Sequence, residues 1–209
     1  MVWQPDARTL RRIYLVRHGR TALNARGALR GRLDPPLDRV GRDEAQALAG
    51  VLGGLAPSAV VASPLLRAVE TANFIATVAD LSVEVETRMI DRDYGPWSGM
   101  AAGQIEDQWG TLDEAPGVEP LPALDGRVRA AFEGLTARLI EPSRIVVVAH
   151  DIVNRSLIAM IDPDRFPARE NVAQRTGCYN ILDLGVAGWR VTGVDILPPS
   201  SSPPEHAGV

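Results

Sequence analysis

Short, almost wholly apolar runs alternate along this chain with longer segments of helical periodicity. The runs Ile13 to Val16, Ala59 to Ala62 and Ile145 to Ala149 have the length of buried strands. Strands that are apolar on both faces occur in parallel sheets that helices cover from both sides. We therefore predict an α/β fold with a mostly parallel sheet and helices on both of its faces.

The segments between these runs supply the remaining elements. Asp38 has the position of an N-cap for a helix that ends at Gly53-Gly54, and Ser63-Pro64 is expected to open the next helix. Further elements are predicted by periodicity: a strand at Val83 to Glu86, helices at Ala101 to Trp109, Ala123 to Ile140 and Ile152 to Ile161, and a terminal hairpin of Tyr179 to Leu184 and Trp189 to Val194.

The chain of 209 residues has the length of one domain, which we place at residues 1–196. Residues 88–122 form a long irregular stretch rich in Gly and Pro, of the kind that usually serves as a functional lid. Residues 197–209 are rich in Pro and Ser and are predicted to be a disordered tail. The single cysteine, Cys178, excludes an intrachain disulfide and is expected to pack in a strand.

Charge and apolar content exclude several classes of partner. The net charge of −4 provides no general basic field for nucleic acid or an anionic membrane. No apolar stretch is long enough to span a membrane, and Met1 to Arg12 lacks the apolar centre of a secretory signal, so we predict a cytoplasmic protein. All 22 basic residues are arginine, which excludes a lysine-dependent P-loop and Schiff-base chemistry. The sequence leaves a homodimer open.

Polar side chains stand where three of the predicted strands end. Arg17 and His18 end the first strand, Arg67 lies in the first turn of the helix after the second, and His150 and Asp151 end the strand Ile145 to Ala149. Because the carboxyl ends of parallel strands meet at one edge, these side chains are expected to form one site.

This set of residues suits a phosphoryl group. Two arginines and one protonated histidine would offset its negative charge, while a second, neutral histidine attacks phosphorus. To be neutral with a free lone pair, the attacking histidine must donate its other ring N–H, which we expect a backbone carbonyl to accept. The arginines should lower the pKa of both histidines. The residues lack metal-ligand spacing, so no metal or other cofactor is expected.

Four blocks of the sequence resemble the histidine phosphatase superfamily, also called the phosphoglycerate mutase-like family. The first block is Arg17 to Asn24, which matches the Arg-His-Gly-x-Thr-x-x-Asn opening of that family. The others are Asp34 to Leu37 with Gly41, then Ser63 to Ala72 and Asp91 to Gly99, and the last match is Val147 to His150. The resemblance covers about residues 12 to 160 and implies the fold of that family.

The resemblance also implies roles for individual residues. His18 resembles the nucleophile that becomes phosphohistidine, Arg17 and Arg67 resemble the phosphate clamps, and His150 resembles the second histidine. Asn24 resembles a further phosphate ligand, and Thr21 and Arg20 are candidates for substrate contacts.

Two positions leave the proton donor open. Asp91 stands where the family usually has a glutamate as general acid. Asp151 follows the second histidine, as in the acid phosphatase branch, in which that aspartate is the donor. Asp151 could instead be only a helix N-cap.

These expectations predict a metal-independent phosphatase that hydrolyses small phosphorylated substrates through phosphohistidine. One alternative is a phosphoglycerate mutase-type isomerase, although the modest segment between Asp91 and His150 favours hydrolysis, since the mutases of the family carry longer inserts there. The other alternative is a phospholigand-binding protein without catalytic activity. It is considered because Asp91 and Arg20 are unusual for the family.

Overall fold

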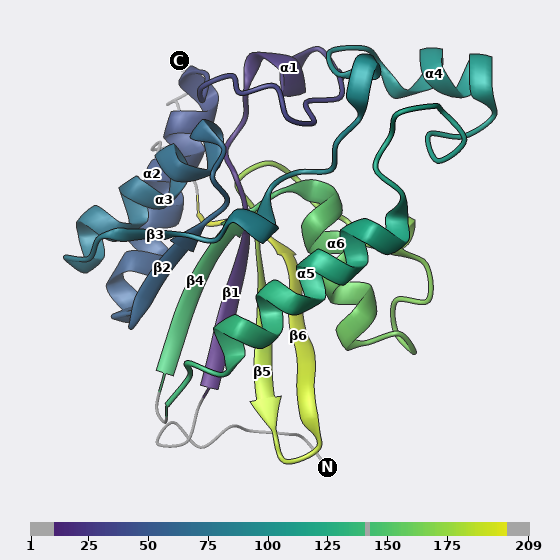
Figure 1. Cartoon of the computed structure of the whole chain (residues 1–209). Coiled ribbons are helices and arrows are strands. Elements are labelled where there is room, and N and C mark those ends of the chain that lie inside the picture. Colours follow the sequence, from purple (N-terminus) through teal and green to yellow (C-terminus); the bar gives the residue numbers. More distant parts are fainter. Residues whose placement is uncertain (1–10, 141–142, 200–209) are drawn as a thin grey trace, which may run out of the picture.

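A single six-stranded sheet forms the centre of the molecule (Figure 1). The structure is a computed structural model that describes residues 11–140 and 143–199. The strand order is β3-β2-β4-β1-β5-β6, with β3, β2, β4 and β1 parallel and the β5–β6 hairpin antiparallel. The strands are β1 (Arg11–Arg17), β2 (Ala59–Ala62), β3 (Val83–Val85), β4 (Ser143–Ala149), β5 (Tyr179–Gly185) and β6 (Gly188–Ile196). The predicted α/β class, mostly parallel sheet and terminal hairpin are confirmed.

Helices cover both faces of the sheet, as predicted. The α-helices are α1 (Ala22–Ala25), α2 (Arg39–Leu52), α3 (Leu66–Ala79), α4 (Ala102–Trp109), α5 (Leu121–Thr136) and α6 (Asp151–Ile161). Helices α2 and α3 pack on one face, while α5 and α6 pack on the other (Figure 1). Tyr14 and Val16 of β1 face the first pair, whereas Ile13 and Leu15 face the second. This alternation explains why the buried strands are apolar at every position.

The predicted start of α2 is confirmed, whereas the expectations for the starts of α3 and α6 are corrected. The Asp38 carboxylate accepts a hydrogen bond from the Gly41 amide at 2.8 Å and caps α2, as predicted. Ser63-Pro64 does not open α3, because Leu65 is still extended and the helix begins at Leu66. The N-cap position of α6 belongs to His150, so Asp151 is the first helical residue rather than the cap.

The predicted boundaries of two other elements shift by a few residues, and Cys178 lies outside the predicted strand. Helix α5 begins at Leu121, with Pro122 in its first turn, and ends at Thr136. Strand β3 ends at Val85. Cys178 is buried immediately before β5 rather than within a strand, and burial raises the pKa of its thiol to about 12.

The stretch 88–122 carries structure of its own. It holds the 3₁₀ turn Gly95–Trp97 and helix α4, which was predicted at this place, and it lies beyond the carboxyl edge of the sheet (Figure 1). A separate small core forms here from Tyr94, Ile105, Ala115 and Val118. Its role as a lid stays a prediction.

Two further expectations concern the C-terminal tail and membrane-spanning segments. The segment before residue 11 and residues 200–209, which include most of the predicted tail, lie outside the described residues. Within the described part, no helix is long and apolar enough to cross a membrane.

Candidate active site

Three neighbouring strands deliver polar residues to one edge of the sheet. His18 follows β1, His150 follows β4 and Ser63 follows β2. The amide of His18 donates to the Ala149 carbonyl at 3.1 Å, and the amide of Ser63 donates to the Val148 carbonyl at 2.9 Å. These bonds continue the parallel pairing past the strand ends, so the three residues lie side by side, as the sequence predicts.

The ring of His18 is held in one orientation. Its Nδ1 lies 2.6 Å from the carbonyl oxygen of Gly19, which can only accept a hydrogen bond, so Nδ1 carries the proton. The lone pair is therefore on Nε2, which accepts a bond from Nε of Arg67 at 3.2 Å. Gly19 is required for this geometry, because a Cβ there would stand 2.4 Å from the Gly41 carbonyl oxygen. The predicted donation to a backbone carbonyl is confirmed.

His150 lies against His18, with the two ring centroids 5.2 Å apart. Its Nε2 is 2.7 Å from the Ser63 hydroxyl. Its Nδ1 is buried and has no hydrogen-bond partner among the described residues; the Asp91 carboxylate is 3.7 Å away. His150 thus keeps one ring nitrogen available for a bond that the described residues do not make.

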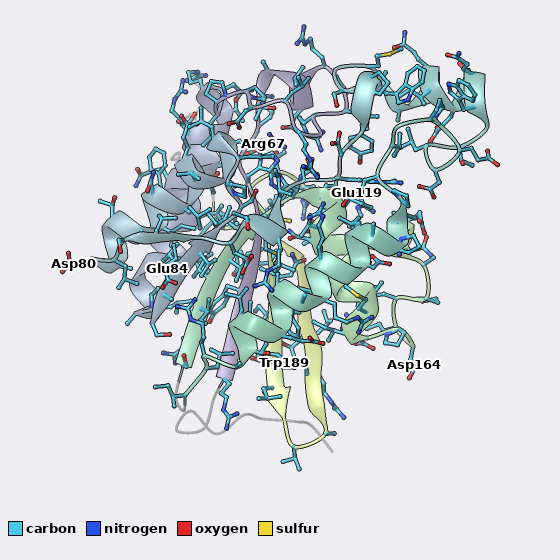
Figure 2. The ribbon with its side chains drawn as sticks, viewed as in Figure 1. Arg67, Asp80, Glu84, Glu119, Asp164 and Trp189 are labelled. Carbon is cyan, nitrogen blue, oxygen red and sulfur yellow. The ribbon has the colours of Figure 1, made fainter. Side chains whose placement is uncertain are left out.

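Arg67 is fully buried, and each of the three nitrogens of its guanidinium group makes a hydrogen bond (Figure 2 shows its place above the sheet). Besides His18, it donates to the carbonyls of Leu33 at 2.8 Å and Gly31 at 3.0 Å. It also pairs with the Asp91 carboxylate at 3.0 Å. Asp91 therefore lies between Arg67 and the second histidine.

Arg17 pairs with the other candidate acid. Its Nη1 is 2.9 Å from the Asp151 carboxylate and also donates to the Gln174 carbonyl, while its buried Nε has no partner among the described residues. Asp151 also binds Arg155, one helical turn later, and its side chain is 25% exposed against 2% for Asp91. The two candidate acids thus lie in different surroundings.

The pKa of each histidine is lowered well below 6.5. Burial is the largest cause for both rings, because it disfavours the charged imidazolium, and the Arg67 charge comes next. The predicted influence of the arginines is present, but burial, which the sequence argument left out, outweighs it. Both rings are therefore neutral at neutral pH.

The buried neutral histidines predict a pH-dependent stability. The unfolded chain takes up protons at His18 and His150 as the pH falls below about 6.5, whereas the folded chain does not. The free energy of unfolding should therefore fall by about 1.4 kcal/mol per pH unit for each ring below that pH. Carboxyl groups with lowered pKa, such as Glu86, act only below pH 4.5. Urea titrations from pH 7.5 to 5 measure the slope, and His150→Asn should halve it; a flat profile contradicts the assignment.

Three of the predicted substrate residues make other contacts. The Arg20 guanidinium pairs with Asp38 at 2.9 Å, and its amide donates to Glu44 at 2.7 Å. Thr21 caps the short helix α1, and its amide and hydroxyl both donate to the Asn24 side-chain oxygen, at 3.0 and 2.8 Å. No hydrogen bond or ion pair among the described residues joins these three side chains to the histidine pair.

Two residues of the site were missed by the sequence analysis. The charge of Arg30 lowers the pKa of Arg17, Arg67 and both histidines, although other causes are larger. Gln174 holds Arg17 through its carbonyl and bonds two buried amides, of Asn154 and Asn180. Arg30 could have been found as an arginine in the glycine-rich loop between the first and second blocks; Gln174 has no such signal.

Comparison with known proteins shows which family this chain belongs to. Residues 13–196 match the family described as histidine phosphatase superfamily (branch 1). The chain belongs to the histidine phosphatase superfamily. The proposed family resemblance is confirmed, and no group of three or more His, Cys, Asp or Glu side chains in the described segments has a metal-binding arrangement.

Several curated proteins are similar to this chain in sequence. Glucosyl-3-phosphoglycerate phosphatase of Mycobacterium tuberculosis (strain ATCC 25618 / H37Rv) is 38% identical over 96 residues, which is 46% of this chain and 43% of that protein. Phosphoserine phosphatase 1 of Hydrogenobacter thermophilus is 31% identical over 156 residues, 70% of this chain and 74% of that protein. The chain spans about half the length of the first of these curated relatives.

Solved structures of other proteins share the fold of this chain. A structure titled mycobacterial hydrolase 2 is 26% identical, with a TM-score of 0.79 over 93% of this chain and 94% of that one. Mycobacterial glucosyl-3-phosphoglycerate phosphatase in complex with VO3 is 29% identical, with a TM-score of 0.78 over 88% of this chain and 98% of that one.

Proposed function

We propose that this chain is a phosphatase that hydrolyses phosphomonoesters through a phosphohistidine on His18. The observation that carries the proposal is the orientation of the His18 ring, whose Nδ1 faces the Gly19 carbonyl and whose Nε2 lone pair faces the guanidinium of Arg67. A neutral imidazole with a fixed tautomer beside cationic groups is suited to attack a phosphoryl group.

In the first step, Nε2 of His18 attacks phosphorus and the bond from phosphorus to the leaving oxygen breaks. The leaving alcohol takes a proton from a carboxylic acid, which becomes a carboxylate. Arg17 and Arg67 hold the phosphoryl oxygens, and His150 donates from Nδ1, the ring nitrogen without a partner in the described structure. The dianion raises the pKa of His150, so that this ring is protonated only in the complex.

In the second step, water replaces the histidine. The carboxylate formed in the first step takes a proton from water, the water oxygen attacks phosphorus, and the nitrogen–phosphorus bond breaks with its electron pair returning to Nε2. Inorganic phosphate then leaves, and every group has its starting proton.

Asp91 is the proton donor that we propose, and it takes this proton from solvent as the substrate binds, before it donates it to the leaving oxygen. Its carboxylate is buried and lies 3.0 Å from Arg67 and 3.7 Å from His150. Asp151 is the alternative; both Arg17 and Arg155 bind it, which favours a role in positioning Arg17. Arg20, Thr21 and Asn24 stay candidates for substrate contacts.

The names of relatives support hydrolysis. Two are called glucosyl-3-phosphoglycerate phosphatase and phosphoserine phosphatase, which act on phosphorylated small molecules by their names. We propose the same class of substrate here, without a metal or other cofactor and in the cytoplasm. The mutase alternative has one observation in its favour, a 28% identity over 191 residues to a probable phosphoglycerate mutase of Enterobacter sp. (strain 638), covering 87% of this chain and 88% of that protein.

Substrate assays separate these functions, and acid variants identify the donor. The purified chain is expected to release phosphate from p-nitrophenyl phosphate and from 3-phosphoglycerate, in the presence of EDTA, without forming 2-phosphoglycerate. Asp91→Asn should lose about 10²- to 10⁴-fold in kcat on alkyl phosphates and much less on the aryl phosphate, whose leaving group needs little protonation. Asp151→Asn should reduce both substrates similarly and more weakly.

Other outcomes of these assays would contradict the proposed function or the proposed proton donor. Isomerisation without phosphate release indicates a mutase, and phosphate binding without turnover at any pH indicates a binding protein. Equal, negligible losses in the two acid variants would mean that neither carboxyl group donates the proton.

A further inference from the structure

The loop before α2 is fixed in place beside the histidine pair. The carbonyls of Gly31 and Leu33 accept bonds from Arg67. On its other side, Leu29 exchanges backbone bonds with the stretch 88–122, at 2.8 Å to the Met100 carbonyl and 2.7 Å from the Gly99 amide. Gly31 has a φ of +50°, and a Cβ there would stand 2.8 Å from the Ser98 hydroxyl. The residue between these anchors therefore has a defined place.

That residue is Arg30, and no carboxylate among the described residues balances its charge. Among the residues in the described ranges, no carboxylate pairs with it; its Nη1 donates to the Ala28 carbonyl at 3.3 Å, and its buried Nε has no partner. The two other arginines of the site, Arg17 and Arg67, each have an aspartate. The field of Arg30 nevertheless reaches both of them and both histidines.

In the proposed substrate complex, the positive charge of Arg30 has no negative charge to balance it. In the complex proposed above, Asp91 carries the proton for the leaving group and His150 is protonated. Arg17, Arg30, Arg67, Arg155 and His150 then supply five positive charges, which face two negative charges of the phosphoryl group and the one of Asp151 that Arg17 and Arg155 share. A further anionic group on the ligand would reduce this excess of positive charge.

We propose that Arg30 binds a second anionic group on the alcohol part of the substrate, a carboxylate or a second phosphate. The substrate class is thus a phosphomonoester whose leaving alcohol is itself an anion. Arginine suits this role because its planar guanidinium donates two parallel bonds to either group. The proposal rests on the function proposed above, since that function places the transferred phosphoryl group on the other two arginines.

Arg30→Gln tests the proposal with substrates that differ in one group. The first pair is 3-phosphoglycerate and glycerol 3-phosphate, which has a hydroxymethyl group in place of the carboxylate. The second pair is propane-1,3-diol bisphosphate and its monophosphate. For the members with the second anion, kcat/KM should fall by about 10- to 100-fold, and for the others and p-nitrophenyl phosphate by less than about threefold. The pair with the larger loss shows which anion is recognised.

Arg32→Gln is the matched control. Arg32 is two residues further along the same loop, is 46% exposed and lies 3.4 Å from Asp93, so its loss should leave the ratio within each pair unchanged. Thermal unfolding of both variants verifies that they fold.

Three results overturn the proposal. An equal loss on all substrates would show that Arg30 holds the transferred phosphoryl group. If Arg30→Gln loses no activity on any substrate, or if the wild type does not prefer the substrates with a second anion, Arg30 does not recognise that anion. If the wild type hydrolyses none of them, the proposed function fails separately; calorimetric titration of wild type and Arg30→Gln with 3-phosphoglycerate and with glycerol 3-phosphate then decides whether Arg30 selects the carboxylate.

Discussion

Replacing His18 by asparagine is expected to lower kcat on p-nitrophenyl phosphate by at least about 10⁴-fold, as removal of a nucleophile does in other covalent enzymes. The asparagine amide can still donate to the Gly19 carbonyl, but no lone pair equivalent to Nε2 remains to attack phosphorus. Steady-state assays measure the loss. Rapid mixing with ³²P-labelled substrate and an alkaline quench, which preserves phosphoramidates, should label the wild type and leave the variant unlabelled.

Binding provides the control for this variant. Arg17, Arg67 and His150 are intact in His18→Asn, so inorganic phosphate should still raise its melting temperature, since a ligand that binds only the folded state stabilises it. A variant that keeps turnover within about tenfold of wild type, or that still becomes labelled, would show that another group is the nucleophile.

The parts of the fold that depend on the spacing of apolar residues and on side-chain polarity could be predicted from the sequence. Apolar runs such as Ile13 to Val16 must be buried on both faces, and that alone requires helices on both sides of the sheet. Parallel strands then bring His18 and His150 to the same edge, although 132 positions separate them in the sequence. The cap at Asp38 depends on one local hydrogen bond and was equally accessible.

Features that depend on tertiary contacts were not predictable. The small core around Tyr94 and Ile105 has no clear period, because the chain reverses there at glycines with positive φ. The direction of the Arg20 side chain depends on Asp38, which only the folded loop brings near. Arg30 is one of 22 arginines in the sequence, and only the three-dimensional arrangement shows that it lies near the histidine pair with a buried Nε that has no partner among the described residues.

Arg67 should have a large effect on both stability and turnover. In Arg67→Met, the Asp91 charge stays buried without its partner, and the Gly31 and Leu33 carbonyls lose their donors. Breaking a buried ion pair from one side costs about 3–5 kcal/mol of unfolding free energy. Loss of one charged donor to the phosphoryl group should also lower kcat by at least about 10²- to 10³-fold. Urea unfolding and steady-state assays measure the two effects.

The double variant Arg67→Met/Asp91→Asn separates these effects. Without the carboxylate charge, stability should recover by at least about 1.5 kcal/mol relative to Arg67→Met, a coupling typical of residues in direct contact. Turnover should not recover, because the donor to the phosphoryl group and the proposed proton donor are both missing. Arg138→Met is the control: Arg138 pairs with Glu84 at 2.7 Å, but both are about half exposed, so its loss should cost no more than about 1 kcal/mol. Strictly additive losses at Arg67 and Asp91 would mean that their ion pair does not hold this site together.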